Sequence, residues 1–269
     1  MIEQDLEIVF NKRVAANTFI MGLRSSQIAA EARPGQFVMI KVGQGIDPLL
    51  RRPFSICGIR GDDLILIFYQ VVGRGTAIMC DAREGESLSV LGPLGSGFEM
   101  PQKEEKPILV AGGMGIAPLI FLATTMEPGS FTFLAGFGSR EEIVATDEIG
   151  LSGFDLSLST DDGSAGHRGL VTELLENQLS GFNSGRLMVF ACGPLPMLKE
   201  VAAITFDKDV PCQVSLEASM ACGLGACQGC AIRRSSEQAI AYYHVCQDGP
   251  VFDVNALDWG RYKAWFIPT

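Results

Sequence analysis

Three cysteines lie within nine residues near the end of the chain, in the segment Cys222-Gly-Leu-Gly-Ala-Cys227-Gln-Gly-Cys230, and Cys246 follows after a longer gap. This C-x4-C-x2-C spacing is the ligand pattern of a plant-type [2Fe–2S] cluster, which needs four thiolates. Gly223, Gly225 and Gly229 favour the tight loop that such a cluster requires, because glycine adopts positive φ and lets the backbone approach closely. We therefore predict that Cys222, Cys227, Cys230 and Cys246 bind a cluster that moves single electrons.

Two other uses of four cysteines stay open at this point. Structural zinc also takes four cysteines, although usually as two separated C-x2-C pairs. A disulfide framework requires an oxidising compartment and usually a smaller domain. The remaining cysteines Cys57, Cys80 and Cys212 are expected to be small buried hydrophobic side chains, which is the usual fate of a free cysteine.

The charge balance disfavours nucleic acid as a partner, because the net charge is −10. Only His167 and His244 are available for acid–base chemistry by histidine, and we predict no catalytic residue. The first residues, Met1-Ile-Glu-Gln-Asp, lack the basic and apolar regions of a signal peptide. Together with eight cysteines, this predicts a cytoplasmic, reducing location.

The uncharged segment 108–126 is long enough to suggest a membrane span. Gly112, Gly113, Gly115 and Pro118 interrupt it, however. The segment is better explained as a buried strand, a glycine turn and a buried helix, so we expect no membrane association.

The first hundred residues have the pattern of an antiparallel β-domain. Short runs of β-branched and aromatic residues alternate with Gly, Pro and Asp turn signals, which is typical of a barrel or sandwich. We expect one short helix at residues 76–82. The predicted strands cover residues 6–10, 18–23, 36–42, 54–59, 64–71 and 87–91.

From about residue 106 onward, strands alternate with helices. This alternation, with nearly continuous apolar strands, predicts a parallel sheet covered by helices, which binds ligands at the carboxyl ends of its strands. Strands are expected at 108–111, 131–135, 154–160, 187–191 and 210–216, and helices at 117–126, 140–149, 170–179 and 196–206. The cysteine-rich piece from residue 217 is too short for a large core, so the cluster should help to fold it.

The segment Arg51-Arg52-Pro53-Phe54-Ser55 contains a candidate anion clamp. Arg52 and Ser55 are close together on one strand, and a guanidinium can fork onto a pyrophosphate. A surface arginine beside an ordinary strand is the alternative. Gly75 and Thr76 follow at the start of the predicted short helix, where backbone amides favour a phosphate.

Two glycine-containing turns follow predicted parallel strands. In Gly112-Gly-Met-Gly115, glycines would allow a dinucleotide pyrophosphate to approach the backbone, although the pattern differs from G-x-G-x-x-G. Cys192-Gly193-Pro194 lies at another strand end, where a small thiol could face a nicotinamide ring. A turn packed for its own sake and a merely buried cysteine are the alternatives.

Other segments are less informative. The loop 161–169, with two aspartates and His167, contacts a nucleotide ribose or is simply solvated. An acid at 141–142 favours NAD, and Arg140 accommodates a 2′-phosphate, so these residues leave the nucleotide open. The aromatic residues Trp259, Tyr262, Trp265 and Phe266 pack on the chain itself or anchor a partner, and we favour the first.

With these motifs in order, the chain resembles the ferredoxin–NADP reductase superfamily over essentially its whole length. It is most similar to the electron-transfer subunits of class 1B dihydroorotate dehydrogenases, above all in residues 217–230 and 246–252. The resemblance implies three domains: an FAD-binding antiparallel β-barrel at 1–102, an NAD-binding α/β domain at 103–216 and a small [2Fe–2S] domain at 217–269.

The resemblance also implies roles for the motif residues. FAD would be held by Arg52, Pro53, Phe54, Ser55, Gly75 and Thr76, and by Phe68, Tyr69 and Gln70 just after the flavin strand. The nicotinamide nucleotide would be held by Gly112, Gly113, Met114, Gly115, Cys192, Gly193 and Pro194, and the family resemblance favours NAD.

The implied activity is electron transfer in pyrimidine biosynthesis. Electrons would pass from the FMN of a dihydroorotate-oxidising catalytic subunit through the cluster and FAD to NAD+. The implied assembly is a heterotetramer with two copies of each subunit. The alternative is a diaphorase-type subunit of another complex, such as an NADH-dependent ferredoxin reductase or a sulfide dehydrogenase.

Overall fold

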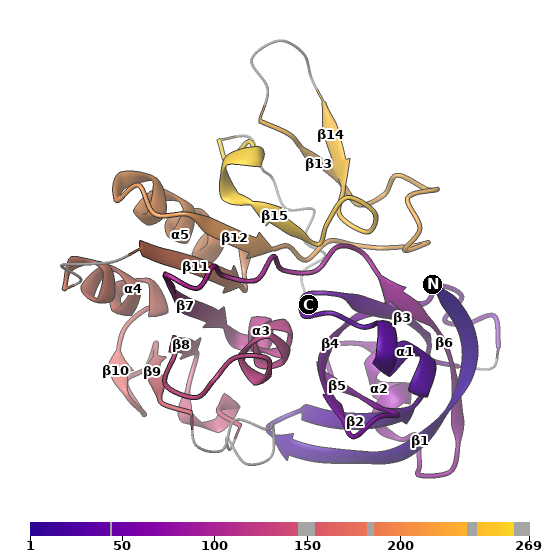
Figure 1. The fold of residues 1–269 in the computed structure, drawn as a ribbon. Coiled ribbons are helices and arrows are strands. Elements are labelled where there is room, and N and C mark those ends of the chain that lie inside the picture. The colour runs from indigo at the N-terminus through magenta and orange to yellow at the C-terminus, as the bar shows by residue number, and fades with distance from the viewer. Residues whose placement is uncertain (44, 145–153, 182–185, 236–240, 261–269) are drawn as a thin grey trace.

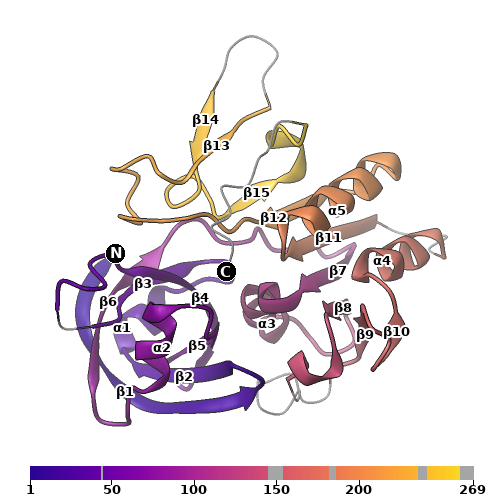
Figure 2. The ribbon, with the colours of Figure 1, turned by 180° about the vertical axis from the view of Figure 1, so that it is seen from behind.

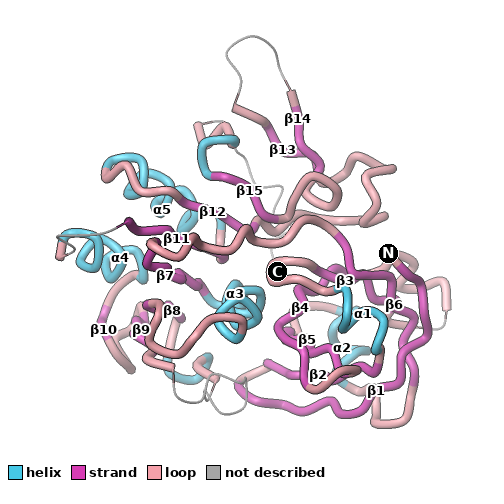
Figure 3. The backbone as a smooth tube through the Cα atoms, in the orientation of Figure 1, coloured by secondary structure: helices cyan, strands magenta, loops and turns pink. Residues whose placement is uncertain are grey.

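The computed structural model describes residues 1–43, 45–144, 154–181, 186–235 and 241–260. Its three parts are a barrel, a sheet covered by helices, and a segment that carries the four cysteines (Figures 1 and 3). No helix among the described residues is long and apolar enough to cross a membrane.

The barrel is closed and antiparallel, as the N-terminal strand pattern predicts. Its strands follow the order β1-β2-β5-β4-β3-β6. Strand residues that alternate toward the inside, such as Ile8, Ile40 and Ile67, are fully buried and form its core. The elements are β1 (Ile2–Ala15), β2 (Thr18–Arg24), α1 (Ser26–Glu31), β3 (Phe37–Lys41), β4 (Arg52–Arg60), β5 (Leu64–Gln70), α2 (Arg74–Cys80) and β6 (Ser87–Leu94).

The second part is a seven-stranded sheet in the order β10-β9-β8-β7-β11-β12-β15. Its neighbouring strands are parallel, as predicted, except that β15 pairs antiparallel with β12. The elements are β7 (Glu105–Gly112), η1 (Gly113–Gly115), α3 (Ile116–Thr124), β8 (Thr132–Phe137), η2 (Arg140–Glu142), β9 (Leu156–Thr160), β10 (His167–Arg168), α4 (Val171–Ser180), β11 (Arg186–Cys192), α5 (Leu195–Asp207) and β12 (Cys212–Ser215).

Helix α3 explains the long uncharged segment. Its residues Ile116–Ala123 are all buried, because one side packs on strands β7 and β11 of the sheet and the other packs on strand β4 of the barrel. A helix covered on both sides has no polar face, so its composition imitates a membrane span.

The helix predicted at 140–149 is wrong over its described part. Residues 140–142 form only a 3₁₀ turn, and Ile143 is extended. The backbone N–H of Gly138 donates to the Glu142 carboxylate, which closes the turn tightly. Residues 145–149 lie outside the described residues.

The cysteine-carrying segment is joined to both other parts. It forms the hairpin β13 (Ala231–Arg233) and β14 (Tyr242–His244), then β15 (Val251–Asp253) and η3 (Val254–Ala256). Strand β15 completes the sheet, and Ser96 after β6 forms a bridge with Pro250. Figure 2 shows the hairpin standing above the line where the barrel meets the sheet.

Of the C-terminal aromatic residues, Trp259 packs against the core of the sheet. Its indole Nε1 donates to the carbonyl of Val254 at 2.8 Å. Tyr262, Trp265 and Phe266 lie outside the described residues.

Candidate functional site

The four cysteines of the C-x4-C-x2-C…C pattern come together in two pairs. The Sγ atoms of Cys230 and Cys246 are 3.2 Å apart, and both residues are buried. The thiols of Cys222 and Cys227 are also hydrogen-bonding neighbours, and Cys227 is exposed. The loop 222–230 therefore has an inner pair and an outer pair of thiols.

Backbone N–H groups of this loop point at the sulfurs. Leu224 donates to Cys222 Sγ at 3.3 Å, and Gly225 donates to Cys246 Sγ at 3.1 Å. Burial of the Cys222 thiol opposes its ionisation, but N–H groups that include those of Leu224 and Cys227 outweigh it and lower its pKa to about 6. The loop thus favours the thiolate of Cys222, the form that binds iron, whereas burial and the Cys230 thiol raise the pKa of Cys246 to about 12.

The loop conformation differs from the expectation at one glycine. Gly223 and Gly225 have positive φ, but Gly229 does not, and Gln228 takes the left-handed conformation instead, with φ 61°. A Cβ on Gly223 would lie 2.6 Å from Met39 Cγ. Glycine is therefore required here, because the loop packs directly on strand β3 of the barrel.

The arrangement of the four thiols in two pairs fits a two-iron cluster. Within the described part of the chain, no three His, Cys, Asp or Glu side chains are grouped tightly enough to hold one ion. Four thiols in two pairs match a cluster in which each iron takes two protein thiolates.

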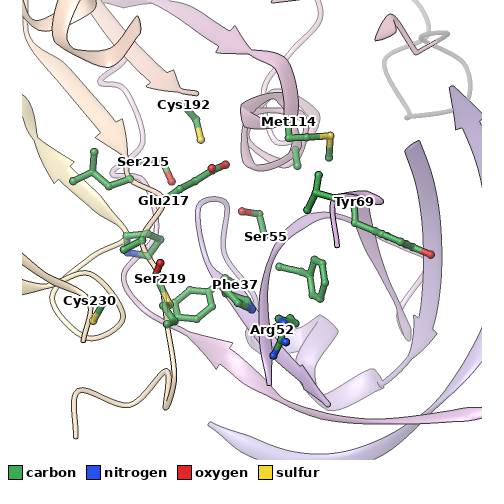
Figure 4. Close-up of a pocket in the computed structure, with 18 of the residues that line it drawn as sticks. Phe37, Arg52, Ser55, Tyr69, Met114, Cys192, Ser215, Glu217, Ser219 and Cys230 are labelled. Atoms are coloured by element: carbon green, nitrogen blue, oxygen red, sulfur yellow. The ribbon is translucent and has the colours of Figure 1, made fainter. Parts of the chain in front are cut away.

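A cavity of about 830 Å³ lies where the barrel, the sheet and the cysteine segment meet (Figure 4). The predicted flavin and nucleotide residues on its wall are Arg52, Pro53, Phe54, Ser55, Phe68, Tyr69, Gln70, Gly75, Thr76, Met114 and Cys192. Its wall also includes Cys230 of the inner thiol pair. Its size is suitable for a large cofactor.

The adjacent residues Arg51 and Arg52 make different contacts. Arg51 donates to the carbonyl of Ser89 at 2.7 Å and pairs with Glu3, so it ties β4 to β6 and β1. Arg52 lies on the cavity wall, where its Nη1 donates to the carbonyl of Leu50 at 2.6 Å. Arg52 is therefore the arginine available to an anionic cofactor.

Gly75 and Thr76 shape the wall beside Arg52. A Cβ on Gly75 would lie 3.1 Å from Arg52 Nε, so glycine lets the guanidinium lie over the first turn of α2. The Thr76 hydroxyl accepts the N–H of Val72 at 3.0 Å and donates to the carbonyl of Gly73. Its side chain thus holds the turn in place, which leaves the backbone to face the cavity.

The three residues Phe68, Tyr69 and Gln70 contribute differently. The Tyr69 ring points away from the cavity (Figure 4) into the barrel core, where its hydroxyl donates to Asn11 at 2.9 Å. Burial raises the pKa of that hydroxyl. Phe68 and Gln70 also line a small second cavity of about 40 Å³, which Gly113, Met114 and Glu142 share.

The two predicted nucleotide turns pack against each other. A Cβ on Gly115 would collide with the backbone of Cys192, and one on Gly112 would lie 2.9 Å from Pro194. Gly193 has φ 159° and packs on the N–H of Gly112. These glycines therefore serve close packing between the ends of β7 and β11.

Gly113 differs from its neighbours. It has φ 51°, and a Cβ there would meet nothing within 4 Å. Together with Met114 and Cys192 it leaves an open approach at the carboxyl ends of the central strands, where parallel sheets bind nucleotides. Burial raises the pKa of the Cys192 thiol, which faces the large cavity.

The loop after β9 is ordered by its own side chains. Asp162 accepts the N–H and hydroxyl of Ser164, and these bonds lower the pKa of its carboxyl. Ser164 Oγ in turn accepts the N–H of Arg140 at 2.8 Å. His167 pairs with Glu173 at 2.7 Å. The loop thus joins the ends of β8 and β9 into one rim.

Sequence reasoning missed Glu217, which is the only carboxylate that the described residues place on the wall of the large cavity. Its carboxyl points into the cavity between Cys192 and Ser55 (Figure 4). The residue is exposed within the cavity, and the protein around its carboxyl desolvates it in part and raises its pKa. The sequence does contain a signal for it, because Glu217 is a single acidic residue between an apolar strand and the first cysteine of the cluster pattern.

Comparison with known proteins adds three kinds of similarity. Residues 217–258 match the iron–sulfur cluster binding domain of dihydroorotate dehydrogenase B. The chain is 36% identical, over 95% of its length and 98% of the relative, to the dihydroorotate dehydrogenase B (NAD(+)) electron transfer subunit of Desulforamulus reducens. The same subunit of Caldanaerobacter subterraneus subsp. tengcongensis is 37% identical over 91% of this chain and 94% of that one.

Solved structures show the same fold. An NADH-dependent reduced ferredoxin-NADP oxidoreductase has a TM-score of 0.80 and 29% identity, and the match covers 95% of this chain and 90% of the other. A ferredoxin NADP+ reductase from Neisseria gonorrhoeae with bound FAD and NADP has a TM-score of 0.61 and 18% identity, and the match covers 77% of this chain and 91% of the other. The second likeness concerns the fold alone.

Proposed function

The chain belongs to the family of dihydroorotate dehydrogenase B (NAD(+)) electron transfer subunits, and from this premise we propose how its residues carry electrons. It is an oxidoreductase subunit with FAD, a [2Fe–2S] cluster and NAD as cofactors. We assign FAD to residues 1–102, NAD to 103–216 and the cluster to 217–269.

One observation gives the strongest support to electron transfer between the nicotinamide, FAD and the cluster. A single cavity is lined by the barrel segment around Arg52, by Met114 and Cys192 of the nucleotide turns, and by the cluster ligand Cys230. FAD held by these residues would supply the chemistry that links nicotinamide, a two-electron carrier, to the cluster, a one-electron carrier.

In this proposal, the residues of the chain bind and orient the three cofactors. Arg52 and the backbone at Gly75 and Thr76 hold the pyrophosphate of FAD, and Pro53, Phe54, Ser55, Phe68, Tyr69 and Gln70 form the flavin wall. Gly113, Met114 and Cys192 face the nicotinamide nucleotide, with Gly112, Gly115, Gly193 and Pro194 shaping the two turns. Cys222, Cys227, Cys230 and Cys246 hold the cluster.

The other substrate is handled by a partner. The relatives are named as subunits of a dihydroorotate dehydrogenase, and the cavity wall holds no second organic site that the described residues reveal. We assign dihydroorotate oxidation to an FMN-containing catalytic subunit, in a heterotetramer with two copies of each chain.

The eight cysteines, all free of disulfides, favour a cytoplasmic location.

The test compares the isolated chain with the reconstituted pair. We expect the isolated chain to oxidise NADH with an artificial electron acceptor but not to oxidise dihydroorotate. Adding the catalytic subunit should produce NAD-linked orotate formation. Dihydroorotate oxidation by this chain alone would contradict the proposal, and so would a purified protein without flavin and iron–sulfur absorption bands.

A further inference from the structure

The outer edge of the cluster loop is where an electron donor has to approach. Cys227 of the outer thiol pair is exposed, and the Leu224 side chain is 44% exposed at the same loop. The inner pair instead lies toward the flavin cavity through Cys230. A partner that delivers electrons must therefore cover residues 222–227, if the proposed function is correct.

The cluster loop alone is too small to hold a partner. A stable interface covers about 800 Å² on each protein, with roughly 20–30 residues a side. A loop of nine residues supplies only part of that. The partner must also contact surface beside the loop, and the chemistry of that surface indicates where.

A second exposed segment lies on the same edge of the molecule. Residues 45–50 follow strand β3, and the cluster loop packs on β3 through Gly223 and Met39. In both Figure 1 and Figure 2, the loop after β3 and the cluster loop protrude on the same side, beside the N-terminus. A partner that covers the cluster loop can therefore also reach this side of the barrel.

Residues 45–50 are unusually apolar for an exposed loop. Ile46 is 86% exposed, Leu49 is 71% exposed and Leu50 is 47% exposed. The one charged residue among them, Asp47, is neutralised by Arg74, whose Nη1 lies 2.5 Å from Asp47 Oδ2. Large apolar side chains with no uncompensated charge are typical of the core of a protein–protein interface.

We propose that residues 45–50 and the cluster loop form one docking surface for the FMN-containing catalytic subunit, with Ile46 and Leu49 as its apolar anchors. This proposal rests on the proposed function and adds the place of contact. Neither anchor lines the flavin cavity. The loop does contact the cavity wall through Leu50, whose carbonyl accepts from Arg52, and through Asp47, which pairs with Arg74. The flavin content of each variant must therefore be measured together with its binding to the partner.

The test uses the full chain with its flavin and cluster. Ile46→Glu and Leu49→Glu each place a charge in the apolar contact, and each should weaken binding to the purified catalytic subunit by about tenfold or more in calorimetric titration. Leu170→Glu and Phe206→Glu are the matched controls. These residues are also exposed, at 56% and 47%, but they lie on α4 and α5 or at their ends, on the far side of the sheet (Figure 1). Both controls should bind as the unchanged chain does.

The outcomes separate the two proposals. If the unchanged chain does not bind the catalytic subunit, the proposed function is wrong. If it binds, and both Ile46→Glu and Leu49→Glu bind equally well with unchanged flavin and iron content, the docking surface is wrong. Light scattering that shows a dimer of the unchanged chain alone, which Ile46→Glu dissociates, would assign the surface to a second copy and overturn the inference.

Discussion

Replacing Arg52 by alanine tests the assignment of the flavin site most directly. The guanidinium lies on the cavity wall, held by the carbonyl of Leu50 at 2.6 Å and by close contact with Gly75. It is therefore oriented before the cofactor arrives, and little side-chain freedom is lost on binding. Removing it should abolish one or two charge-assisted hydrogen bonds to the pyrophosphate of FAD.

The expected loss follows from the strength of such bonds. A hydrogen bond to a charged group contributes about 1.5–3 kcal/mol. Because each 1.4 kcal/mol corresponds to a factor of ten, Arg52→Ala should weaken FAD binding roughly 10- to 150-fold. The affinity of Arg52→Lys for FAD should lie between those of the unchanged chain and Arg52→Ala, because lysine keeps the charge but lacks the planar guanidinium that binds two oxygens at once.

The assay is fluorescence titration of the flavin-free protein with FAD, and the neighbouring residue supplies the control. Arg51 binds the carbonyl of Ser89 and Glu3 instead of facing the cavity. Arg51→Ala should therefore lower the unfolding temperature more than it changes the affinity of correctly folded protein for FAD. The reasoning is refuted if Arg52→Ala binds FAD within about twofold of the unchanged chain.

Two further predictions concern the cluster and the acid in the cavity. Cys227→Ser should lose iron and sulfide on chemical analysis, whereas Cys57→Ser, at a thiol buried in the barrel region, should keep both; full retention in Cys227→Ser would disprove the ligand assignment. Glu217 is exposed within the cavity, but the protein around it desolvates its carboxyl in part and raises its pKa. The folded chain therefore holds this proton to higher pH than the unfolded chain does, and stability falls as pH rises above the ordinary glutamate range. Glu217→Gln should accordingly raise the unfolding temperature at about pH 8 but not at about pH 4.5, and an equal shift at both would show that the carboxyl pays no desolvation cost.

Features whose signal is local were predictable from the sequence. The spacing from Cys222 to Cys230 reflects the size of the cluster, because a loop must bring thiols to a rigid group of fixed dimensions. The barrel strands and the β–α alternation follow from side-chain periodicity, which depends on neighbours along the chain. The position of Arg52 followed from its place at the start of a strand pattern.

Tertiary structure decided what depends on contacts between distant segments. The spacing to Ser55 singles out Arg52 in the sequence, but only the folded barrel shows that Arg51 instead binds the carbonyl of Ser89 and Glu3. Gly112 and Gly115 have the composition of a phosphate-binding turn, but their Cβ positions are filled by residues about eighty positions away. Glu217 enters the flavin cavity because β12 ends beside the barrel, and β15 joins the sheet by pairing with β12. Such contacts arise from the packing of whole elements, so a sequence window does not contain them.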